Sequence, residues 1–198
     1  MDMFNTAVIL AGGKSTRMGF DKQLLMINEK LLCQCVWESL KGTFDDLLIV
    51  TNTPDVYKEM PFRTCSDEFV NMGPLAGIHV ALKYARSKYV YLLACDMPVI
   101  CANYIQHMMT RIKETQAQIC VTRRNDRIEP FNAFYSTDLL SDVEQRLRNG
   151  SSSLFRFISS ANSLILPEEE AAAYDNALEM YTNLNTCSDY YQFTRKED

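Results

Sequence analysis

The sequence predicts a single α/β domain, residues 1–198, with a mostly parallel central sheet and helices on both of its faces. Short apolar runs alternate with helical patterns through most of the chain, as βαβ crossovers require. A length of 198 residues suits one domain with a sizeable core. The composition, 47% hydrophobic and 23% charged, is that of an ordinary globular protein and argues against disorder.

The expected elements follow one another along the chain. Apolar runs that end at turn residues indicate buried strands, and longer stretches with helical spacing indicate helices. In order we expect strand 7–10, helix 32–40, strand 47–50, a weaker strand 62–65, helix 75–85, strand 89–94, helix 102–113 and strand 119–122. Beyond these, 129–135 reads as a strand in which Pro130 indicates an edge position or the start of the strand. Helical patterns follow at 137–148 and 153–160, and the chain ends in a short helix and a charged tail.

The loop after the first strand is the most informative segment. Residues 10–22 read L-A-G-G-K-S-T-R-M-G-F-D-K. The paired glycines, Gly12 and Gly13, let a backbone turn sharply and approach a ligand closely. Lys14, Arg17 and Lys22 supply enough positive charge to hold a polyphosphate. The loop is typical of a nucleoside triphosphate site; the alternative is a tight turn with exposed lysines.

Two common phosphate-binding motifs do not match this loop. A P-loop requires a glycine five residues before Gly13, and Val8 stands there. The dinucleotide-binding fingerprint requires glycines at the second and fifth positions after Gly12, where the chain has Lys14 and Arg17. We therefore expect an open loop in which glycines and side-chain cations hold the phosphates together.

Charge and cysteine content narrow the class of protein. A net charge of −5 argues against a nucleic-acid binder, which usually carries a basic surface. The seven cysteines are odd in number and scattered, and with two histidines they form no zinc-binding spacing, so we expect reduced, buried thiols. The N-terminus lacks a targeting pattern and no run is long enough to span a membrane, which favours a cytoplasmic protein without membrane contact.

Polar residues follow each of the first four expected strands. Ligands of open α/β sheets bind beyond the carboxyl ends of the strands, so the loop 12–22, Asn52, Asp67 and Asp96 should converge on one edge. Asp96 suits a magnesium ligand, because Mg²⁺ takes one or two carboxylates plus phosphate oxygens; the alternative is a cap on the next helix. Asn52 and Asp67 suit recognition of a base or ribose, or are simply turn residues.

Three further segments carry open alternatives. Residues 73–77, G-P-L-A-G, begin a helix with small side chains that admit a flat base or allow close packing. Asn183 and Asn185 alternate about Leu184, so both amides face the same way and either bind an acceptor or cap the following helix. The run 123–127 is a solvated hairpin tip or a patch that attracts an anionic second substrate.

These motifs, in this order, resemble the molybdenum cofactor guanylyltransferases. The resemblance spans residues 7 to 193 and rests on the loop 10–22, G-P-L-A-G at 73–77, C-D-M-P at 95–98, E-P-F-N-A-F-Y at 129–135 and N-L-N-T at 183–186. The first loop alone marks the wider group of nucleotidyltransferases that activate sugars and alcohols. Cytidylyltransferase relatives tend to have L-A-A-G there and to lack G-P-L-A-G, so L-A-G-G favours guanine.

The resemblance implies a Rossmann-like, GT-A type nucleotidyltransferase fold and transfer of GMP from GTP to molybdenum-bearing molybdopterin, with release of pyrophosphate. It implies GTP contacts from Leu10, Ala11, Gly12, Lys22, Asn52, Asp67 and Asp96, with Mg²⁺ on Asp96. By the same match, Gly13 and Arg17 belong to the phosphate loop, Arg17 and Lys22 offset the charge of the leaving pyrophosphate, and Asn183 and Asn185 lie on the acceptor side. We expect a monomer that contacts other cofactor-biosynthesis proteins and molybdoenzymes only transiently.

Two residues depart from the family pattern. Cys187 stands where proline usually follows N-I-N-T, and Phe131 replaces the usual leucine after Pro130. Both are compatible with changes in packing. The alternatives are a related cytidylyltransferase or sugar-phosphate nucleotidyltransferase, and a catalytically silent nucleotide-binding homologue; the latter is disfavoured because Asp96, Arg17 and Lys22 are all present.

Overall fold

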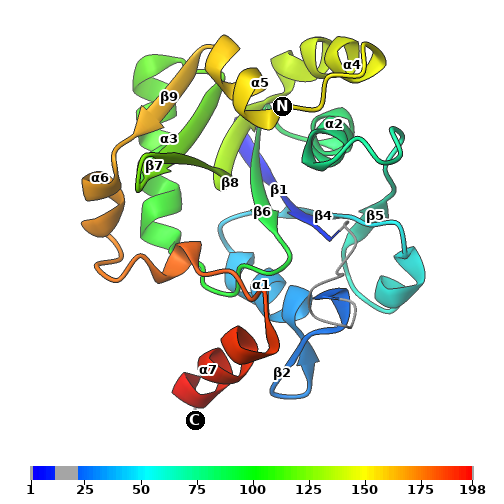
Figure 1. Ribbon diagram of the computed structural model, residues 1–198, viewed down its shortest axis with the longest axis vertical. Coiled ribbons are helices and arrows are strands. Elements are labelled where there is room, and N and C mark those ends of the chain that lie inside the picture. The colour runs from blue at the N-terminus through cyan, green and yellow to red at the C-terminus, as the bar shows by residue number, and fades with distance from the viewer. Residues whose placement is uncertain (1, 12–21, 198) are drawn as a thin grey trace.

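A central sheet with helices on both faces organises the computed structural model, which describes residues 2–11 and 22–197 (Figure 1). Within these residues the sheet has seven strands in the order β5-β4-β1-β6-β8-β7-β9. Its strands are β1 (Phe4–Leu10), β4 (Asp46–Val50), β5 (Arg63–Cys65), β6 (Tyr89–Ala94), β7 (Ile119–Arg124), β8 (Arg127–Ser136) and β9 (Ser163–Leu166). A separate short hairpin pairs β2 (Met26–Ile27) with β3 (Lys30–Leu31).

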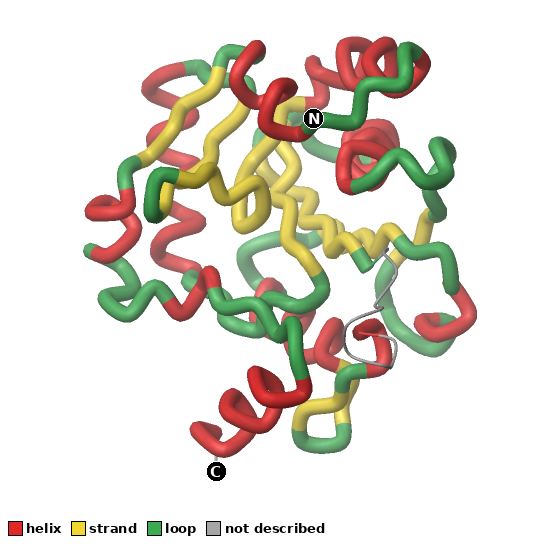
Figure 2. The backbone as a smooth tube through the Cα atoms, in the orientation of Figure 1, coloured by secondary structure: helices red, strands yellow, loops and turns green. Residues whose placement is uncertain are grey.

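The helices lie between and after the strands, as the tube in Figure 2 shows. The α-helices are α1 (Leu32–Leu40), α2 (Pro74–Tyr84), α3 (Ala102–Thr115), α4 (Leu140–Arg148), α5 (Leu154–Ser160), α6 (Glu168–Ala172) and α7 (Cys187–Glu197). The 3₁₀ turns are η1 (Lys22–Leu24), η2 (Pro54–Tyr57), η3 (Thr137–Leu139) and η4 (Glu179–Tyr181). Every strand and helix expected up to residue 160 is present, with ends that differ by a few residues.

Strand direction confirms a mostly parallel sheet. Strands β5, β4, β1 and β6 run parallel to one another, and β9 runs parallel to β7. Only β8 is antiparallel to both of its neighbours, β6 and β7. The carboxyl ends of β1, β4, β5 and β6 therefore meet at one edge of the sheet.

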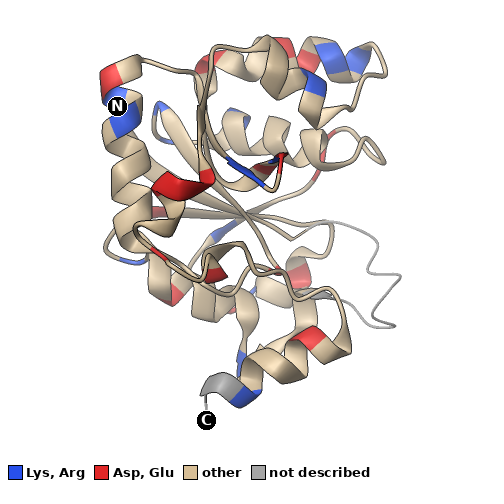
Figure 3. Ribbon diagram, turned by 60° about the vertical axis from the view of Figure 1, so that its left-hand side comes forward, with Lys and Arg blue, Asp and Glu red and all other residues tan. Residues whose placement is uncertain are grey.

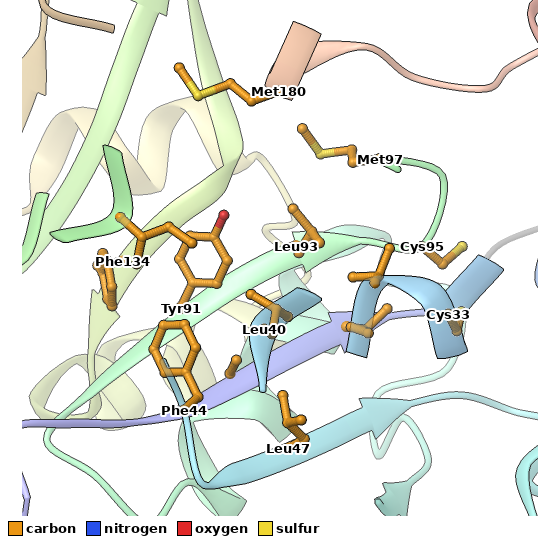
Figure 4. Close-up of a cluster of buried hydrophobic side chains, with 14 of the residues drawn as sticks. Cys33, Leu40, Phe44, Leu47, Tyr91, Leu93, Cys95, Met97, Phe134 and Met180 are labelled. Atoms are coloured by element: carbon orange, nitrogen blue, oxygen red, sulfur yellow. The ribbon is translucent and has the colours of Figure 1, made fainter. Parts of the chain in front are cut away.

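Alternate residues of the central strands feed two cores, one on each face. Ala7 and Ile9 of β1 belong to the core that α1 and α3 cover, whereas Val8 and Leu10 belong to the core under α2, α4 and α5. Figure 4 shows part of the first core, in which the rings of Phe44, Tyr91 and Phe134 pack against one another. Because both faces are buried, the strands read as continuous apolar runs.

Two features of the second half differ from the prediction. Strand β8 lies inside the sheet, so the expected edge position of Pro130 is wrong. The register between β7 and β8 is irregular around Pro130, and β8 pairs with β6 only over residues 133–136, so no neighbouring strand needs the missing N–H of the proline. Strand β9 was not expected, because its polar flanks and short length give a weak pattern.

The seven cysteines, all in the described part of the chain, form no disulfide: three are buried, three are half-buried, and Cys187 is exposed. Burial raises the pKa of Cys33 to about 11 and that of Cys120 to about 12, so both stay protonated thiols at neutral pH. In Figure 3, positions with acidic and basic side chains are interspersed over the helices and loops in view. Among the described residues, no helix is both long and apolar enough to cross a membrane.

Candidate nucleotide and acceptor site

The carboxyl edge of β1, β4, β5 and β6 brings the predicted residues together. Leu10 pairs in register with Val50 on one side and with Ala94 on the other, and Val50 pairs with Cys65. Beyond the strand ends, the hydrogen bonds continue from the N–H of Ala11 to the Val50 carbonyl at 2.8 Å and from the N–H of Cys95 to the Leu10 carbonyl at 3.1 Å. Residues that follow four different strands thus form one rim.

Asn52 and Asp67 form a reciprocal pair on this rim. The Asn52 Nδ2 donates to Asp67 Oδ2 at 3.3 Å, and the Asp67 N–H donates to Asn52 Oδ1 at 3.3 Å. The other carboxylate oxygen, Asp67 Oδ1, is buried and has no partner among the described residues. Burial raises the pKa of Asp67, and the bond from Asn52 lowers it less. A buried acceptor without a donor suits a ligand that supplies N–H or O–H groups.

Asp96 lies just past β6, half-buried, in a turn closed by a 3.1 Å bond from the Met97 N–H to the Ala94 carbonyl. It does not cap the next helix, since α3 begins at Ala102 with Cys101 at its N-cap position. The helix-cap alternative for Asp96 is therefore wrong. Its backbone carbonyl accepts a hydrogen bond of 2.8 Å from the N–H of Leu184, which brings the asparagine motif beside it.

The asparagine motif, residues 183–186, lies beside the turn that contains Asp96. Asn183 is half-buried and its Nδ2 donates to the Tyr181 carbonyl at 3.2 Å, while Asn185 is exposed. Helix α7 is capped by Thr186, whose Oγ1 accepts from the Asp189 N–H at 3.1 Å. Asp189 Oδ2 in turn accepts from the Thr186 N–H at 2.8 Å, which completes a capping box. Thr186 therefore caps the first turn of α7.

The G-P-L-A-G segment packs directly on the end of β1. Gly73 precedes α2 with a positive φ of 66°, a conformation that favours glycine, and Pro74 is the first helical residue. A Cβ atom built on Gly77 would lie 3.3 Å from Leu10 Cδ2. Close packing therefore accounts for Gly77, and it holds Leu10 in place where the phosphate loop begins.

The phosphate loop itself lies outside the described residues. This applies to Gly12, Gly13, Lys14 and Arg17, and to the side chain of Lys22. Leu10 and Ala11, which lead into it, are buried, and they present a ligand with backbone groups more than side chains. The hairpin tip at 123–127 is confirmed as the β7–β8 turn.

One anchor of this site was not anticipated from the sequence. Gln23 is buried in η1 directly after Lys22, and its Oε1 accepts from Thr51 Oγ1 at 2.6 Å and from Thr53 Oγ1 at 3.1 Å. These bonds fasten the end of the phosphate loop to the chain that leaves β4. In the sequence, Gln23 is an uncharged amide after a charged loop, and a glutamine in such a position can have many other roles.

The donors on the rim suit magnesium held together with phosphates. No group of three or more histidine, cysteine or acidic side chains able to hold a metal occurs in the described part of the chain. Mg²⁺ commonly binds through one or two carboxylates and completes its shell with substrate oxygens and water. The half-buried carboxylate of Asp96, just past β6, fits that pattern.

Comparisons with known proteins point in one direction. Residues 7–164 match the family model described as the MobA-like NTP transferase domain. The chain is 48% identical over 194 residues to the molybdenum cofactor guanylyltransferase of Syntrophotalea carbinolica, covering 98% of this chain and 92% of that protein. It is 36% identical to a probable molybdenum cofactor guanylyltransferase of Peptoclostridium acidaminophilum, covering 98% and 90%.

Solved structures share the fold. The crystal structure of molybdopterin-guanine dinucleotide biosynthesis protein A from Archaeoglobus fulgidus superposes with a TM-score of 0.84 at 22% identity, covering 96% of this chain and 97% of that one. A nucleotidyl transferase from Methanothermobacter superposes with a TM-score of 0.71 at 19% identity, covering 99% and 98%. The expected nucleotidyltransferase fold is therefore confirmed.

Proposed function

The chain belongs to the MobA-like NTP transferase family, and from this premise we propose that it transfers GMP from GTP to molybdenum-bearing molybdopterin. It is a nucleotidyltransferase, and the products are the molybdopterin guanine dinucleotide cofactor and pyrophosphate. The observation that carries the proposal is 48% identity over nearly the whole chain to a molybdenum cofactor guanylyltransferase. The convergence of Asn52, Asp67 and Asp96 on one edge of the sheet supports the proposal.

We assign the two substrates to different parts of this rim. Asn52 and Asp67 hold the base or ribose of GTP, with Asp67 Oδ1 accepting a hydrogen bond from the nucleotide. Gly12, Gly13, Arg17 and Lys22 hold the phosphates, together with the backbone of Leu10 and Ala11. Asn183 and Asn185 contact the acceptor, because the bond between Leu184 and Asp96 places their segment beside the expected metal position.

The chemistry requires positioning more than proton transfer. A terminal phosphate oxygen of molybdopterin attacks the α-phosphorus of GTP, a new phosphoanhydride bond forms, and the bond to the β-phosphate breaks as pyrophosphate leaves. A phosphate acceptor is already ionised at neutral pH, so no general base is needed. Arg17 and Lys22 offset the charge that grows on the leaving pyrophosphate.

Asp96 is the residue that would hold Mg²⁺. When bound there, the ion would supply positive charge that offsets the negative charge of the transition state. The turn after β6 fixes the Asp96 backbone, so its carboxylate starts from a defined position at the edge of the sheet. We also propose that the enzyme works in the cytoplasm, which agrees with seven cysteines that form no disulfide among the described residues. We propose further that it is a monomer and that its contacts with other cofactor-biosynthesis proteins and molybdoenzymes are transient.

A nucleotide-selectivity assay tests the proposal. The full chain is incubated with Mg²⁺ and each of GTP, CTP, ATP and UTP, with and without molybdopterin, while pyrophosphate and dinucleotide products are measured. We expect products only with GTP and molybdopterin together. Transfer of CMP in preference to GMP would identify a cytidylyltransferase instead, and binding of GTP without any transfer would identify a silent homologue.

A further inference from the structure

Asn132 has an unusual backbone for a strand residue. It lies within β8 with a φ of 55°, in the left-handed region, where the register against β7 is irregular. Asparagine tolerates this region better than most residues, and such conformations persist where the surroundings enforce them. The hydroxyl of Tyr135 donates to the Pro130 carbonyl at 2.7 Å and already stabilises this bulge from within β8. This hydrogen bond of the bulge does not involve the Asn132 side chain.

That side chain joins two elements far apart in the sequence. Asn132 is 2% exposed, and its Oδ1 accepts a hydrogen bond from the hydroxyl of Tyr91 in β6. Burial raises the pKa of Tyr91, so the hydroxyl keeps its proton and acts as donor. The Asn132 Nδ2 donates to the carbonyl of Met180 in η4 at 3.4 Å. Figure 4 shows the Tyr91 hydroxyl on the side of its ring toward Met180.

The hydrogen bond to Met180 is one of several that hold the chain leading to the asparagine motif, and the Met180 N–H also donates to Asp175 Oδ2 at 2.8 Å. Tyr181, the next residue, donates from its hydroxyl to Thr122 Oγ1 in β7 at 2.6 Å. The N–H of Leu184 donates to the Asp96 carbonyl at 2.8 Å. The segment 180–184 is thus attached to β8, to β7 and to the turn after β6, with Asn183 and Asn185 at its end.

We propose that Asn132 is a positioning residue for the acceptor: its amide sets where segment 180–184 lies and thereby aims Asn183 and Asn185. This rests on the proposed function, because the acceptor is the one named there. The amide satisfies both of its buried partners at once, so any substitution that removes it leaves the Met180 carbonyl without that donor. Segment 180–184 then shifts or loosens, while the nucleotide half of the rim, built on β1, β4 and β5, keeps its own hydrogen bonds.

The central variant is Asn132→Gly, which accepts the positive φ and removes the amide. Tyr135→Phe is the matched control, since it removes a hydrogen bond of the same bulge, and Tyr135 belongs to the core on the opposite face of the sheet from Met180, Tyr181 and Leu184. Three quantities are measured for each variant: hydrogen exchange of the Leu184 amide, kcat/KM for molybdopterin, and the dissociation constant for GTP. The Thr51 amide, bonded to the Cys65 carbonyl at 2.8 Å, serves as internal reference on the nucleotide side.

We expect Asn132→Gly to accelerate exchange at Leu184 and to lower kcat/KM for molybdopterin by about tenfold, because misplaced binding groups lose rate steeply. Exchange at Thr51 and the GTP dissociation constant should stay within about twofold. Asn132→Asp keeps an acceptor for Tyr91 but replaces the donor to Met180, so it should resemble Asn132→Gly. Tyr135→Phe should lower the melting temperature without either change at the acceptor side.

Equal acceptor kinetics in Asn132→Gly and Tyr135→Phe would overturn the proposal, as would unchanged exchange at Leu184 in Asn132→Gly. A failure of the proposed function has a different signature. In that case the wild-type protein transfers nothing to molybdopterin, and Asn132 has no acceptor to position. Faster exchange at Leu184 in Asn132→Gly would then still establish the tie between the bulge and segment 180–184.

Discussion

The N–H of Leu184 donates a 2.8 Å hydrogen bond to the backbone carbonyl of Asp96. This bond connects the asparagine motif, which we propose contacts the acceptor, to the residue that we propose holds Mg²⁺. The bond uses only backbone atoms. A substitution that changes only the side chain of Asp96 or of Leu184 therefore leaves this hydrogen bond intact. The chemical role of the carboxylate can thus be tested apart from the architecture of the site.

Asp96→Asn is expected to lower GMP transfer by at least about 100-fold, because the amide is a poor ligand for Mg²⁺ and phosphoryl transfer depends on charge neutralisation. Pyrophosphate release across a Mg²⁺ titration measures the loss, and the melting temperature should move by less than about 3 °C. Asp55→Asn is the control, since that carboxylate is 80% exposed and forms an ion pair with the nearby Lys58 on the surface. Wild-type turnover in Asp96→Asn would contradict the metal assignment.

Asp67→Asn is expected to weaken GTP binding about tenfold and yet to stabilise the free protein at neutral pH. The loss of affinity is that of one charge-assisted hydrogen bond. The gain in stability follows from the raised pKa of Asp67, because the folded state disfavours the buried charge. That penalty is present above the folded-state pKa and vanishes as pH falls below the ordinary aspartate range, so the stability difference between variant and wild type should shrink in acid.

Urea unfolding at a series of pH values and GTP titration by calorimetry measure these two effects. Asp45→Asn is the matched control, since Asp45 is exposed and precedes β4 at the opposite end of the strand. Asp45→Asn should change neither the GTP affinity nor the pH profile. Unaltered GTP affinity in Asp67→Asn would remove Asp67 from the nucleotide site.

Gly77→Ala is expected to destabilise the protein by about 1 kcal/mol, because its methyl group would lie 3.3 Å from Leu10 Cδ2. Overpacking of a core costs about 1–3 kcal/mol, and the better helix propensity of alanine returns about 1 kcal/mol. Leu10→Ala removes the atoms that Gly77→Ala would strike, so in that background the same substitution should stabilise. Denaturant unfolding of the two single variants and the double variant completes the cycle, and a destabilising Gly77→Ala in both backgrounds would exclude the contact as the cause.

The fold and the convergence of Asn52, Asp67 and Asp96 on one rim could be predicted because the signals lie in short, contiguous stretches of sequence. Strand β6 is a continuous apolar run, and Asp96 is the first charged residue after it, so both its position and its candidate role follow from neighbouring residues. Asn132 could not be identified this way. Its partners, Tyr91 and Met180, are distant in the chain, and Pro130 in the same motif indicated an edge strand that tertiary packing overrode.

The same distinction between local signals and long-range contacts applies to Gln23 and Thr186. A glutamine after a charged loop has no distinctive pattern, and its bonds to Thr51 and Thr53 arise only when β1 and β4 pair. Thr186 and Asp189, by contrast, have the spacing of a capping box and could have been recognised.

His79 makes the stability of α2 sensitive to acid. It is 2% exposed, packs edge-on against Phe69 with ring centroids 5.0 Å apart, and its Nδ1 has no partner among the described residues. Desolvation lowers the pKa of His79; Glu68 and Glu144 act against this shift, whereas Lys83 and Arg148 add to it. The unfolded chain therefore takes up a proton below about pH 6.5 while the folded protein still resists it. The stability that the neutral His79 contributes is fully present above that pH and is lost as pH falls toward the pKa of His79 in the folded protein.

His79→Phe keeps an aromatic ring in contact with Phe69 and removes the titrating group, so its free energy of unfolding should fall less than that of the wild type between pH 7 and pH 5. Urea unfolding at half-unit pH steps measures the two profiles. Phe69→Leu is the control: it weakens the packing around His79 but keeps an apolar side chain over the imidazole and keeps the titrating group, so it should lower stability by a similar amount at every pH. Parallel profiles for wild type and His79→Phe would show that the imidazole accepts its proton as readily in the folded protein as in the unfolded chain.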